Sequence, residues 1–245
     1  MVLQAALNGA RSKADHSAVP VSIDELVADA TGCVAAGAAL LHLHPRDVDG
    51  RETLAPDVVD AVVERVRAAA GVPVSVSTGA WIEPDPRRRA ALVSRWRAPD
   101  LASVNLSEEG YGSVMRALLD AGVGIEAGVW SGHDAERLAA SGLGDRVTRI
   151  LIELIDVPTG EALAAAGEIH AVLDRTGLTS ARRLQHGEGE PTWPMLEDAV
   201  ERGIDTRIGL EDTLQDPDGA TTSGNVALVR AARRLAEPGS LSAGG

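Results

Sequence analysis

The chain has 245 residues, enough for one large α/β barrel, and its 44% hydrophobic and 24% charged residues are ordinary for a globular domain. Its net charge of −13 argues against a nucleic-acid partner, because binding to phosphate backbones needs a basic surface. A single cysteine, Cys33, excludes an intrachain disulfide. No apolar run approaches the ~20 residues of a membrane helix and no signal-peptide pattern is visible, so we expect a cytoplasmic protein without membrane contacts.

Short β-like runs alternate with helical segments along the chain. The expected strands are Leu3–Leu7, Leu40–His44, Val72–Ser77, Leu101–Leu106, Val123–Val129, Val147–Ile155, Arg183–His186 and Thr206–Leu210. The expected helices are Ser22–Ala36, Pro56–Ala70, Pro86–Arg97, Gly112–Ala121, Asp134–Ala140, Thr159–Thr176, Pro191–Arg202 and Gly224–Leu235. Ser22 and Glu25 have the spacing of a helix capping box.

This regular alternation favours a closed parallel barrel of the (β/α)8 type over an open doubly wound sheet. An open sheet more often has fewer strands, and no Gly-rich phosphate loop follows the first run. We therefore predict a single α/β (β/α)8 TIM-barrel catalytic domain over residues 1–236. The Pro/Gly/Ser-rich residues 237–245 are expected to form a flexible tail.

Side chains able to bind a metal, donate a hydrogen bond or carry a proton recur at the carboxyl ends of the expected strands. Barrels of this type have their active sites at that end. In chain order these side chains are Asn8, His42, His44, Ser77, Thr78, Ser103, Asn105, Glu126, Glu153, His186, Glu211 and Asp212. Random placement would rarely produce this at nearly every strand. The sequence thus predicts an active site at this end of the barrel.

His42 and His44 are two residues apart in a strand, so both side chains leave the same face. With Glu211 across the barrel they form a two-histidine, one-carboxylate set, which is typical of catalytic zinc. Other divalent ions use the same nitrogen and oxygen donors, so zinc is a preference among metals. The alternative interpretation is a pair of buried histidines bonded to backbone groups.

Arg207 and Glu211 are four residues apart, so in a strand both side chains point to the same, inward face. Asp212 follows as the last strand ends. An arginine can bind a substrate carboxylate through two N–H groups, and a neighbouring aspartate can hold it in place. The alternative is a surface ion pair, but Ile208 and Leu210 indicate a buried strand.

The remaining polar residues at the strand ends are weaker indicators of a functional site. Ser77 and Thr78 place two hydroxyls at the mouth, although such residues also cap helices. Ser103 and Asn105 share a strand face and are candidates to bind a substrate oxygen.

Glu126 is either a buried acid–base group or the structural partner of an arginine. His186 and Glu188 are expected in a loop, where solvation is the more common outcome. Three consecutive arginines, Arg87 to Arg89, could meet coenzyme phosphates, but a charged helix start on the surface is favoured.

Four segments resemble the β-keto acid cleavage enzyme family: Gly37–Asp47 (GAALLHLHPRD), Val76–Gly79 (VSTG), Ala102–Asn105 (ASVN) and Arg207–Asp212 (RIGLED). The similarity runs in order from Leu3 to about Arg234, and the segments on the second and eighth strands are the specific ones. The resemblance implies a zinc-dependent, retro-Claisen-type acyl transfer between a β-keto acid and acetyl-CoA. It also implies that the products are acetoacetate and a new acyl-CoA and that the enzyme is a homo-oligomer.

The resemblance also implies roles for individual residues. His42, His44 and Glu211 would bind zinc, Arg207 and Asp212 would form the activating pair, and Ser77 and Ser103 would orient the substrate carboxylate. Glu126 is a further catalytic candidate, and Thr78 and Asn105 are further substrate-binding candidates. Members of the family commonly carry Gly-Ala-Glu after the first strand, with that glutamate as another ligand, whereas this chain has Gly9-Ala10-Arg11.

Two other functions stay open on the residues alone. One is another metal-assisted enolate reaction, by an aldolase or isomerase, which would need metal but not coenzyme A. The other is a non-catalytic barrel that binds an anionic metabolite or serves as a subunit. A metal-dependent hydrolase with an H-x-H pair is disfavoured, because that class needs further histidines on the fifth and sixth strands, where this chain has Glu126 and Glu153.

Overall fold

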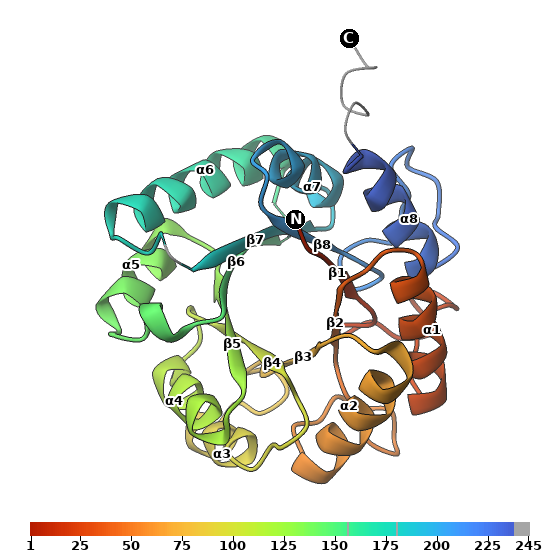
Figure 1. The fold of residues 1–245 in the computed structure, drawn as a ribbon, viewed down its shortest axis with the longest axis horizontal. Coiled ribbons are helices and arrows are strands. Elements are labelled where there is room, and N and C mark those ends of the chain that lie inside the picture. Colours follow the sequence, from red (N-terminus) through yellow and green to blue (C-terminus); the bar gives the residue numbers. More distant parts are fainter. Residues whose placement is uncertain (156, 180, 238–245) are drawn as a thin grey trace.

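The computed structural model describes residues 1–155, 157–179 and 181–237. Eight parallel strands follow one another around a closed barrel, and the first strand completes the ring by pairing with the second and the eighth. Figure 1 shows the strands as an inner ring with the helices outside it. The predicted (β/α)8 architecture is confirmed. Within the described ranges, no helix is long and apolar enough to cross a membrane.

The strands are β1 (Leu3–Ala6), β2 (Leu40–Leu43), β3 (Val74–Ser77), β4 (Leu101–Asn105), β5 (Gly124–Val129), β6 (Arg149–Ile155), β7 (Arg182–Glu188) and β8 (Asp205–Ile208). The helices are α1 (Ile23–Ala35), α2 (Pro56–Ala70), α3 (Pro86–Val93), α4 (Tyr111–Ala121), α5 (Gly132–Ala140), α6 (Thr159–Arg175), α7 (Thr192–Glu201) and α8 (Asn225–Leu235). A short 3-10 turn, Gly144–Arg146, precedes β6. Every predicted strand and helix is therefore present, most with ends shifted and α2 with the predicted ends. Most of the predicted tail, residues 238–245, lies outside the described residues.

Two boundaries differ from the prediction for identifiable reasons. Helix α3 ends at Val93 instead of Arg97, because the Asp60 carboxylate accepts hydrogen bonds from the backbone N–H groups of Arg97 and Ala98, each at 2.9 Å. Strand β7 continues to Glu188 because it stays in register with the long β6, as far as the pair Ile155 and Glu188. The predicted strand Arg183–His186 is therefore confirmed and extends further, and the expectation that His186 and Glu188 lie in a loop was wrong.

Capping groups define the start of α1. The Ser22 hydroxyl accepts a hydrogen bond from the Glu25 backbone at 3.3 Å, and the Glu25 carboxylate accepts one from the Ser22 backbone at 2.9 Å. The predicted capping box is confirmed. These reciprocal bonds satisfy N–H groups that have no partner within the first helical turn.

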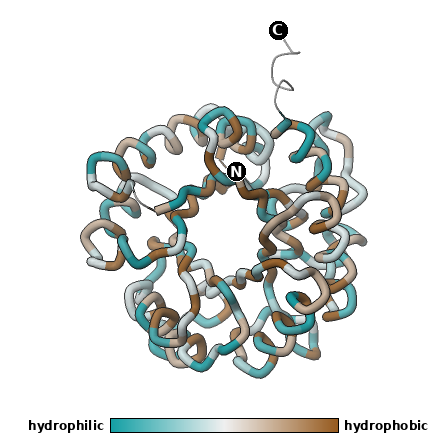
Figure 2. Tube along the Cα trace, in the orientation of Figure 1, coloured by the Kyte–Doolittle hydropathy of each residue, from teal (hydrophilic) through white to brown (hydrophobic). Residues whose placement is uncertain are grey.

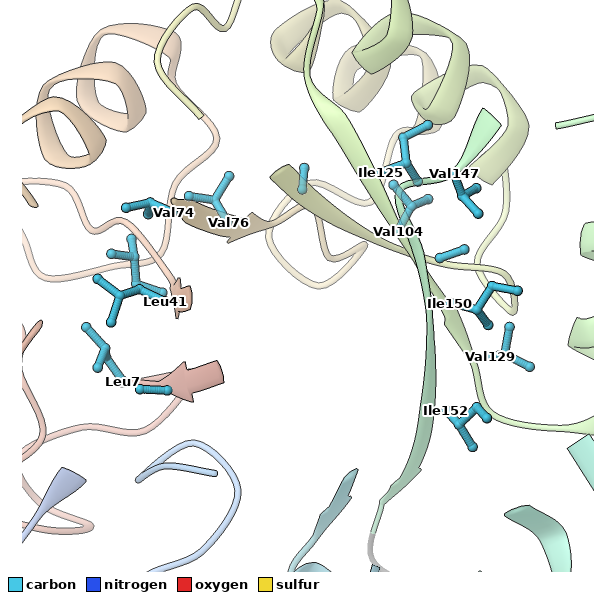
Figure 3. Close-up of a cluster of buried hydrophobic side chains, with 14 of the residues drawn as sticks. Leu7, Leu41, Val74, Val76, Val104, Ile125, Val129, Val147, Ile150 and Ile152 are labelled. Atoms are coloured by element: carbon cyan, nitrogen blue, oxygen red, sulfur yellow. The ribbon is translucent and has the colours of Figure 1, made fainter. Parts of the chain in front are cut away.

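The outward faces of the strands are aliphatic and pack against the helices. Leu41 on β2, Val74 and Val76 on β3, and Ile150 and Ile152 on β6 are fully buried. Figure 3 shows these side chains pointing away from the barrel interior. Hydrophilic segments lie mainly on the outer rim of the helices in Figure 2. The main hydrophobic core is thus the layer between the strands and the helices.

The inward faces of the strands are mostly polar, although barrels of this fold usually fill their interior with branched aliphatic side chains. The buried inward set includes Gln4, His42, Ser75, Ser77, Ser103, Glu126, Arg149, Glu153, His186, Asp205 and Arg207. Burying so many polar groups is costly unless they bond to one another or serve a ligand. This directs attention to the two ends of the barrel interior.

Candidate active site

A cavity of about 350 Å³ opens at the carboxyl ends of the strands. The residues singled out in the sequence that line it are Arg11, His42, His44, Ser77, Ser103, Asn105, Glu153, His186, Glu188, Arg207 and Glu211. Thr78, Glu126 and Asp212 are buried beside or below it without being part of the lining. The end of the barrel expected from the sequence therefore carries this cavity.

His42, His44 and Glu211 converge at this cavity. His42 lies on β2, His44 directly follows that strand, and Glu211 lies in the turn after β8. The Nε2 atoms of His42 and His44 are 3.7 and 3.5 Å from the same Glu211 oxygen, Oε1. Potential ligand atoms of the three residues all lie within 4.8 Å of one another.

The other ring nitrogens of the two histidines are occupied. His42 Nδ1 lies 3.2 Å from the Ser75 hydroxyl, and His44 Nδ1 is hydrogen-bonded to the Glu52 carboxylate. Asn8 fixes the backbone of His44, accepting its N–H at 2.9 Å and donating to its carbonyl at 3.0 Å. Both Nε2 atoms are thereby directed at Glu211, as outer partners orient metal-binding imidazoles in known sites.

Burial and neighbouring charges shift the pKa values of the two histidines in opposite directions. Burial lowers the pKa of His42 to about 3, with Arg207 and His44 adding to the effect. Burial also acts to lower the pKa of His44, but the carboxylates of Glu211 and Glu52 outweigh it and raise that pKa to about 9. Without a cation, His44 is therefore protonated at neutral pH and supplies the positive charge between the two carboxylates.

The donor set fits a divalent metal. The second oxygen of Glu211, Oε2, is buried and has no hydrogen-bond partner among the residues that the structure describes. Burial acts to raise the pKa of Glu211, but Arg207 and the two histidines hold it well below the usual value. A charged carboxylate with a spare oxygen beside two imidazole nitrogens matches the donors that zinc takes at catalytic sites.

Gly9 makes room for Glu211. Its φ of +53° is in the left-handed region, and a Cβ at this position would lie 2.5 Å from Cγ of Glu211. Only a glycine allows the loop after β1 to pass this close to the carboxylate side chain without strain.

Arg207 on β8 is held by two carboxylates. Its Nη2 donates to Asp212 Oδ1 at 2.7 Å and to Glu211 Oε1 at 2.8 Å, and its Nε donates to Asp212 Oδ1 at 3.1 Å. Arg207 is 4% exposed and Asp212 is fully buried, which excludes a surface ion pair. The guanidinium is therefore rigidly placed in the cavity wall next to the two histidines and Glu211.

The opposite wall holds Glu153 and His186, which the sequence analysis listed as strand-end residues without giving them a role, and Trp130, which it did not single out. Glu153 Oε2 accepts a hydrogen bond from Trp130 Nε1 at 2.7 Å, and Glu153 Oε1 lies 3.5 Å from His186 Nε2. His186 Nδ1 lies 3.6 Å from Asp212 Oδ1. A polar chain thus runs around the cavity from Arg207 through Asp212 to Glu153.

Sequence signals could have identified parts of this wall. Glu153 was visible as a polar strand end, and Trp130 directly follows a strand in a chain with only four tryptophans. Trp81 and Glu52 carried no such signal. Glu52 accepts a hydrogen bond from Trp81 Nε1 at 3.2 Å, and the Trp81 ring stacks at 6.1 Å from the ring of His44.

Glu126 lies beneath the cavity. Its carboxylate accepts hydrogen bonds from the Ser75 hydroxyl and from Gln4 Nε2, the latter at 3.3 Å, and lies 3.7 Å from Arg149 Nε. Since Ser75 also contacts His42, Glu126 is connected to the histidine through one hydroxyl. Of the two interpretations from the sequence, the arginine partner matches these contacts.

Two further expectations concern residues outside the cavity lining. Thr78 donates to the Ser103 carbonyl at 2.6 Å and so ties the end of β3 to β4. Arg89, expected on the surface, is 1% exposed and pairs with Glu108 at 3.1 Å. That expectation was wrong because the segment after β4 folds over Arg89, whose Nη2 donates to the Glu109 carbonyl at 2.6 Å.

Fold and site together define a (β/α)8 barrel with a histidine–carboxylate cluster and an arginine–carboxylate pair at its carboxyl end. The sequence profile of the beta-keto acid cleavage enzyme family matches residues 1–241. The chain belongs to this family.

Individual relatives share limited sequence identity with this chain. The chain is 37% identical over 93 residues to a 3-oxoadipate:acetyl-CoA acetyltransferase of Cupriavidus necator, a match that covers 38% of this chain and 32% of that protein. It is 23% identical to the 3-keto-5-aminohexanoate cleavage enzyme of Acetoanaerobium sticklandii, over 97% of this chain and 92% of that protein. The apo structure of ObcA is similar in fold, with a TM-score of 0.68 and 18% identity over 88% of this chain and 61% of that one.

Proposed function

We propose that this protein is a metal-dependent acyltransferase, with zinc as the preferred metal, that condenses a β-keto acid with acetyl-CoA. The products are acetoacetate and the acyl-CoA of the remaining chain. The observation that carries the proposal is the convergence of His42, His44 and Glu211 beside Arg207 in a chain of this family. The acetyl-CoA acetyltransferase among its relatives supports the co-substrate.

The metal would be held by the Nε2 atoms of His42 and His44 and by the Glu211 carboxylate. When bound, a divalent cation supplies Lewis-acid polarisation of a keto group and charge stabilisation for an enolate. The chain's own contribution begins with Glu52 and Ser75, which hold the outer nitrogens of the two histidines. In this scheme Glu126 is a positioning residue, acting on His42 through Ser75.

Arg207 supplies a fixed positive charge at the reacting centre. Asp212 and Glu211 hold it in one orientation, so it stabilises developing negative charge without first having to reorganise. Asp212 is a catalytic candidate through this arginine, because the aspartate is not itself part of the cavity lining.

Polar side chains on β3 and β4 are suited to orient the substrate carboxylate. Ser77 and Ser103 present hydroxyls to the cavity, and Asn105 is held by a hydrogen bond from its Nδ2 to Glu108 at 3.2 Å. Thr78 contributes to this substrate-binding set by holding the backbone of Ser103. We further propose a single catalytic domain over residues 1–236, a cytoplasmic location and a homo-oligomeric state.

The test is direct. Zinc-loaded protein is incubated with acetyl-CoA and a panel of β-keto acids, and acetoacetate and acyl-CoA are measured. His42→Ala should abolish turnover and bound zinc, whereas His133→Ala, which changes an exposed histidine on α5, should alter neither. No acetoacetate from any acid would refute the proposal. Turnover that needs the metal but not coenzyme A would favour an aldolase or isomerase.

A further inference from the structure

Arg11 crosses the mouth of the cavity from the loop after β1 to the loop after β8. Its Nε donates to the backbone carbonyl of Glu211 at 3.2 Å. Its own carbonyl accepts a hydrogen bond from Arg46 Nη2 at 2.7 Å, and the same nitrogen donates to the Gly9 carbonyl at 2.8 Å. The backbone of Arg11 and the Nε end of its guanidinium are therefore both held, and the residue lines the cavity.

The outer edge of this guanidinium carries no hydrogen bond within the described part of the chain. The nearest opposite charge is Glu188, whose Oε1 lies 3.9 Å from Arg11 Nη2, too far for a hydrogen bond. Asp15 also lines the cavity, but its carboxylate is engaged by the backbone and hydroxyl of Ser12 at 2.7 and 2.8 Å. The Arg11 side chain is 27% exposed and lines the cavity, so it is accessible to a ligand bound there.

Arg207, the other arginine in the described lining, differs from Arg11 in its carboxylate partners. Two carboxylates contact its guanidinium at 2.7 and 2.8 Å and neutralise its charge locally. Arg11 has no carboxylate at hydrogen-bond distance among the described residues. A planar guanidinium with a free edge is suited to bind a carboxylate through two parallel hydrogen bonds.

Arg11 is adjacent to the proposed metal site, because it is bonded to the backbone of Glu211 itself. An acid whose keto and carboxylate groups are held near His42 and His44 would present its far end to neighbouring parts of the cavity wall. The diphosphate of a coenzyme A molecule is separated from its thioester by the whole pantetheine arm, so it is not the group that meets Arg11. The cavity, at about 350 Å³, is near the lower limit for ligand pockets, which favours a short substrate.

We propose that Arg11 binds a terminal carboxylate of the substrate, so that short β-keto diacids are preferred over β-keto monoacids of equal length. Arg11 is then a specificity-determining residue. The inference rests on the proposed function for the orientation of the keto acid, but the recognition of the second carboxylate rests on Arg11 alone.

The experiment compares 3-oxoadipate with 3-oxohexanoate, which differ only in the terminal carboxylate. Wild type, Arg11→Gln, Arg11→Lys and the control Arg51→Gln, which changes a surface arginine, are loaded with zinc. Turnover is measured with acetyl-CoA. Binding is measured without acetyl-CoA from the fluorescence of Trp81 and Trp130, both part of the cavity lining.

Wild type should prefer the diacid in both assays. Arg11→Gln should weaken binding and lower kcat/KM for the diacid by about 10- to 100-fold, the usual worth of hydrogen bonds to a charged group, and change the monoacid values by less than about threefold. Arg11→Lys should restore part of the diacid binding as a point charge, and Arg51→Gln should match wild type.

The inference would be overturned if Arg11→Gln lowered binding and kcat/KM equally for both acids, or if wild type showed no preference for the diacid. A loss of bound zinc in Arg11→Gln that accounts for both effects would also overturn it. Selective, Arg11-dependent binding of the diacid without any acetoacetate would support the role of Arg11 while refuting the proposed reaction. These measurements therefore distinguish a failure of the Arg11 role from a failure of the proposed reaction.

Discussion

Two arginine–carboxylate clusters are stacked inside this barrel. The mouth cluster consists of Arg207, Glu211 and Asp212, and the lower cluster of Arg149, Glu126 and Asp205. Contacts in the mouth cluster are as short as 2.7 Å, whereas Arg149 lies 3.7 and 4.0 Å from its two carboxylates. Asp205 is instead bonded to Arg182 at 2.9 Å and to the backbone N–H of Val2 at 2.6 Å.

The clusters differ most in what they leave unpaired. In the lower cluster, Nε and Nη1 of Arg149 are buried without a hydrogen bond to any described residue. In the mouth cluster, the unpaired group is a carboxylate oxygen of Glu211, beside two imidazoles and an open cavity. Spare donors repel a cation and spare acceptors attract one. The same residue types therefore form a closed internal charge cluster in one layer and a cluster suited to bind a cation in the other.

The largest expected contrast is between Glu211→Gln and Glu126→Gln. Glu211→Gln removes a proposed ligand, so bound zinc should be lost and turnover should fall about 1000-fold or more. Glu126→Gln acts on His42 only through Ser75, so zinc should remain and activity should fall no more than about 100-fold. Metal analysis and steady-state kinetics measure both. Equal zinc loss in the two variants would contradict the distinction between the clusters.

The aspartates of the two clusters should separate activity from stability. Asp212→Asn removes one of the two carboxylates that hold Arg207, so kcat should fall about 100-fold with zinc retained. Asp205→Asn weakens the ion pair with Arg182 and removes one of the two carboxylates near the buried Arg149, so it should lower the free energy of unfolding by about 3 kcal/mol, with kcat nearly unchanged. Denaturant unfolding and kinetics on both proteins provide the check. A large kcat effect in Asp205→Asn would show that the lower cluster takes part in the reaction.

The two histidine pKa values predict a pH dependence of metal uptake. At pH 7 His42, with its pKa lowered to about 3, is neutral, and His44, with its pKa raised to about 9, carries a proton. A metal must displace that proton, so zinc uptake should release about one proton, and affinity should rise about tenfold per pH unit up to about pH 9. Calorimetry in buffers of different ionisation enthalpy measures the release. A pH-independent affinity between pH 7 and 9 would contradict the prediction.

The smallest effect concerns the glycine beside the mouth cluster. Gly9→Ala places a Cβ 2.5 Å from Glu211 Cγ, so zinc affinity should fall about tenfold as the carboxylate shifts. Gly71→Ala at the end of α2 has the same kind of backbone, with φ +70° and no atom within 4 Å of the new Cβ. It should cost about 1–2 kcal/mol of stability and leave zinc affinity unchanged. Unchanged affinity in Gly9→Ala would mean that Glu211 tolerates the displacement.

The sequence by itself determined the fold and the nearest-neighbour geometry of the site. The period-two pattern of a strand places His42 and His44 on one face, and Arg207, Glu211 and Asp212 are close along the chain. Strand–helix alternation predicted the barrel because connections between parallel strands leave few other closed arrangements. All of these inferences depend on spacing along the chain, which the sequence contains directly.

Only the tertiary structure decided the depth of each residue and its partners from distant segments. Glu126 pairs in register with Arg149, whereas Glu153 pairs with His186 nearer the mouth, and that difference follows from the register between strands. Loops bring Glu52 to His44 and Arg11 to Glu211. Register and loop contacts arise from packing between segments far apart in the chain, so two inward glutamates that look alike in sequence occupy different layers of the barrel.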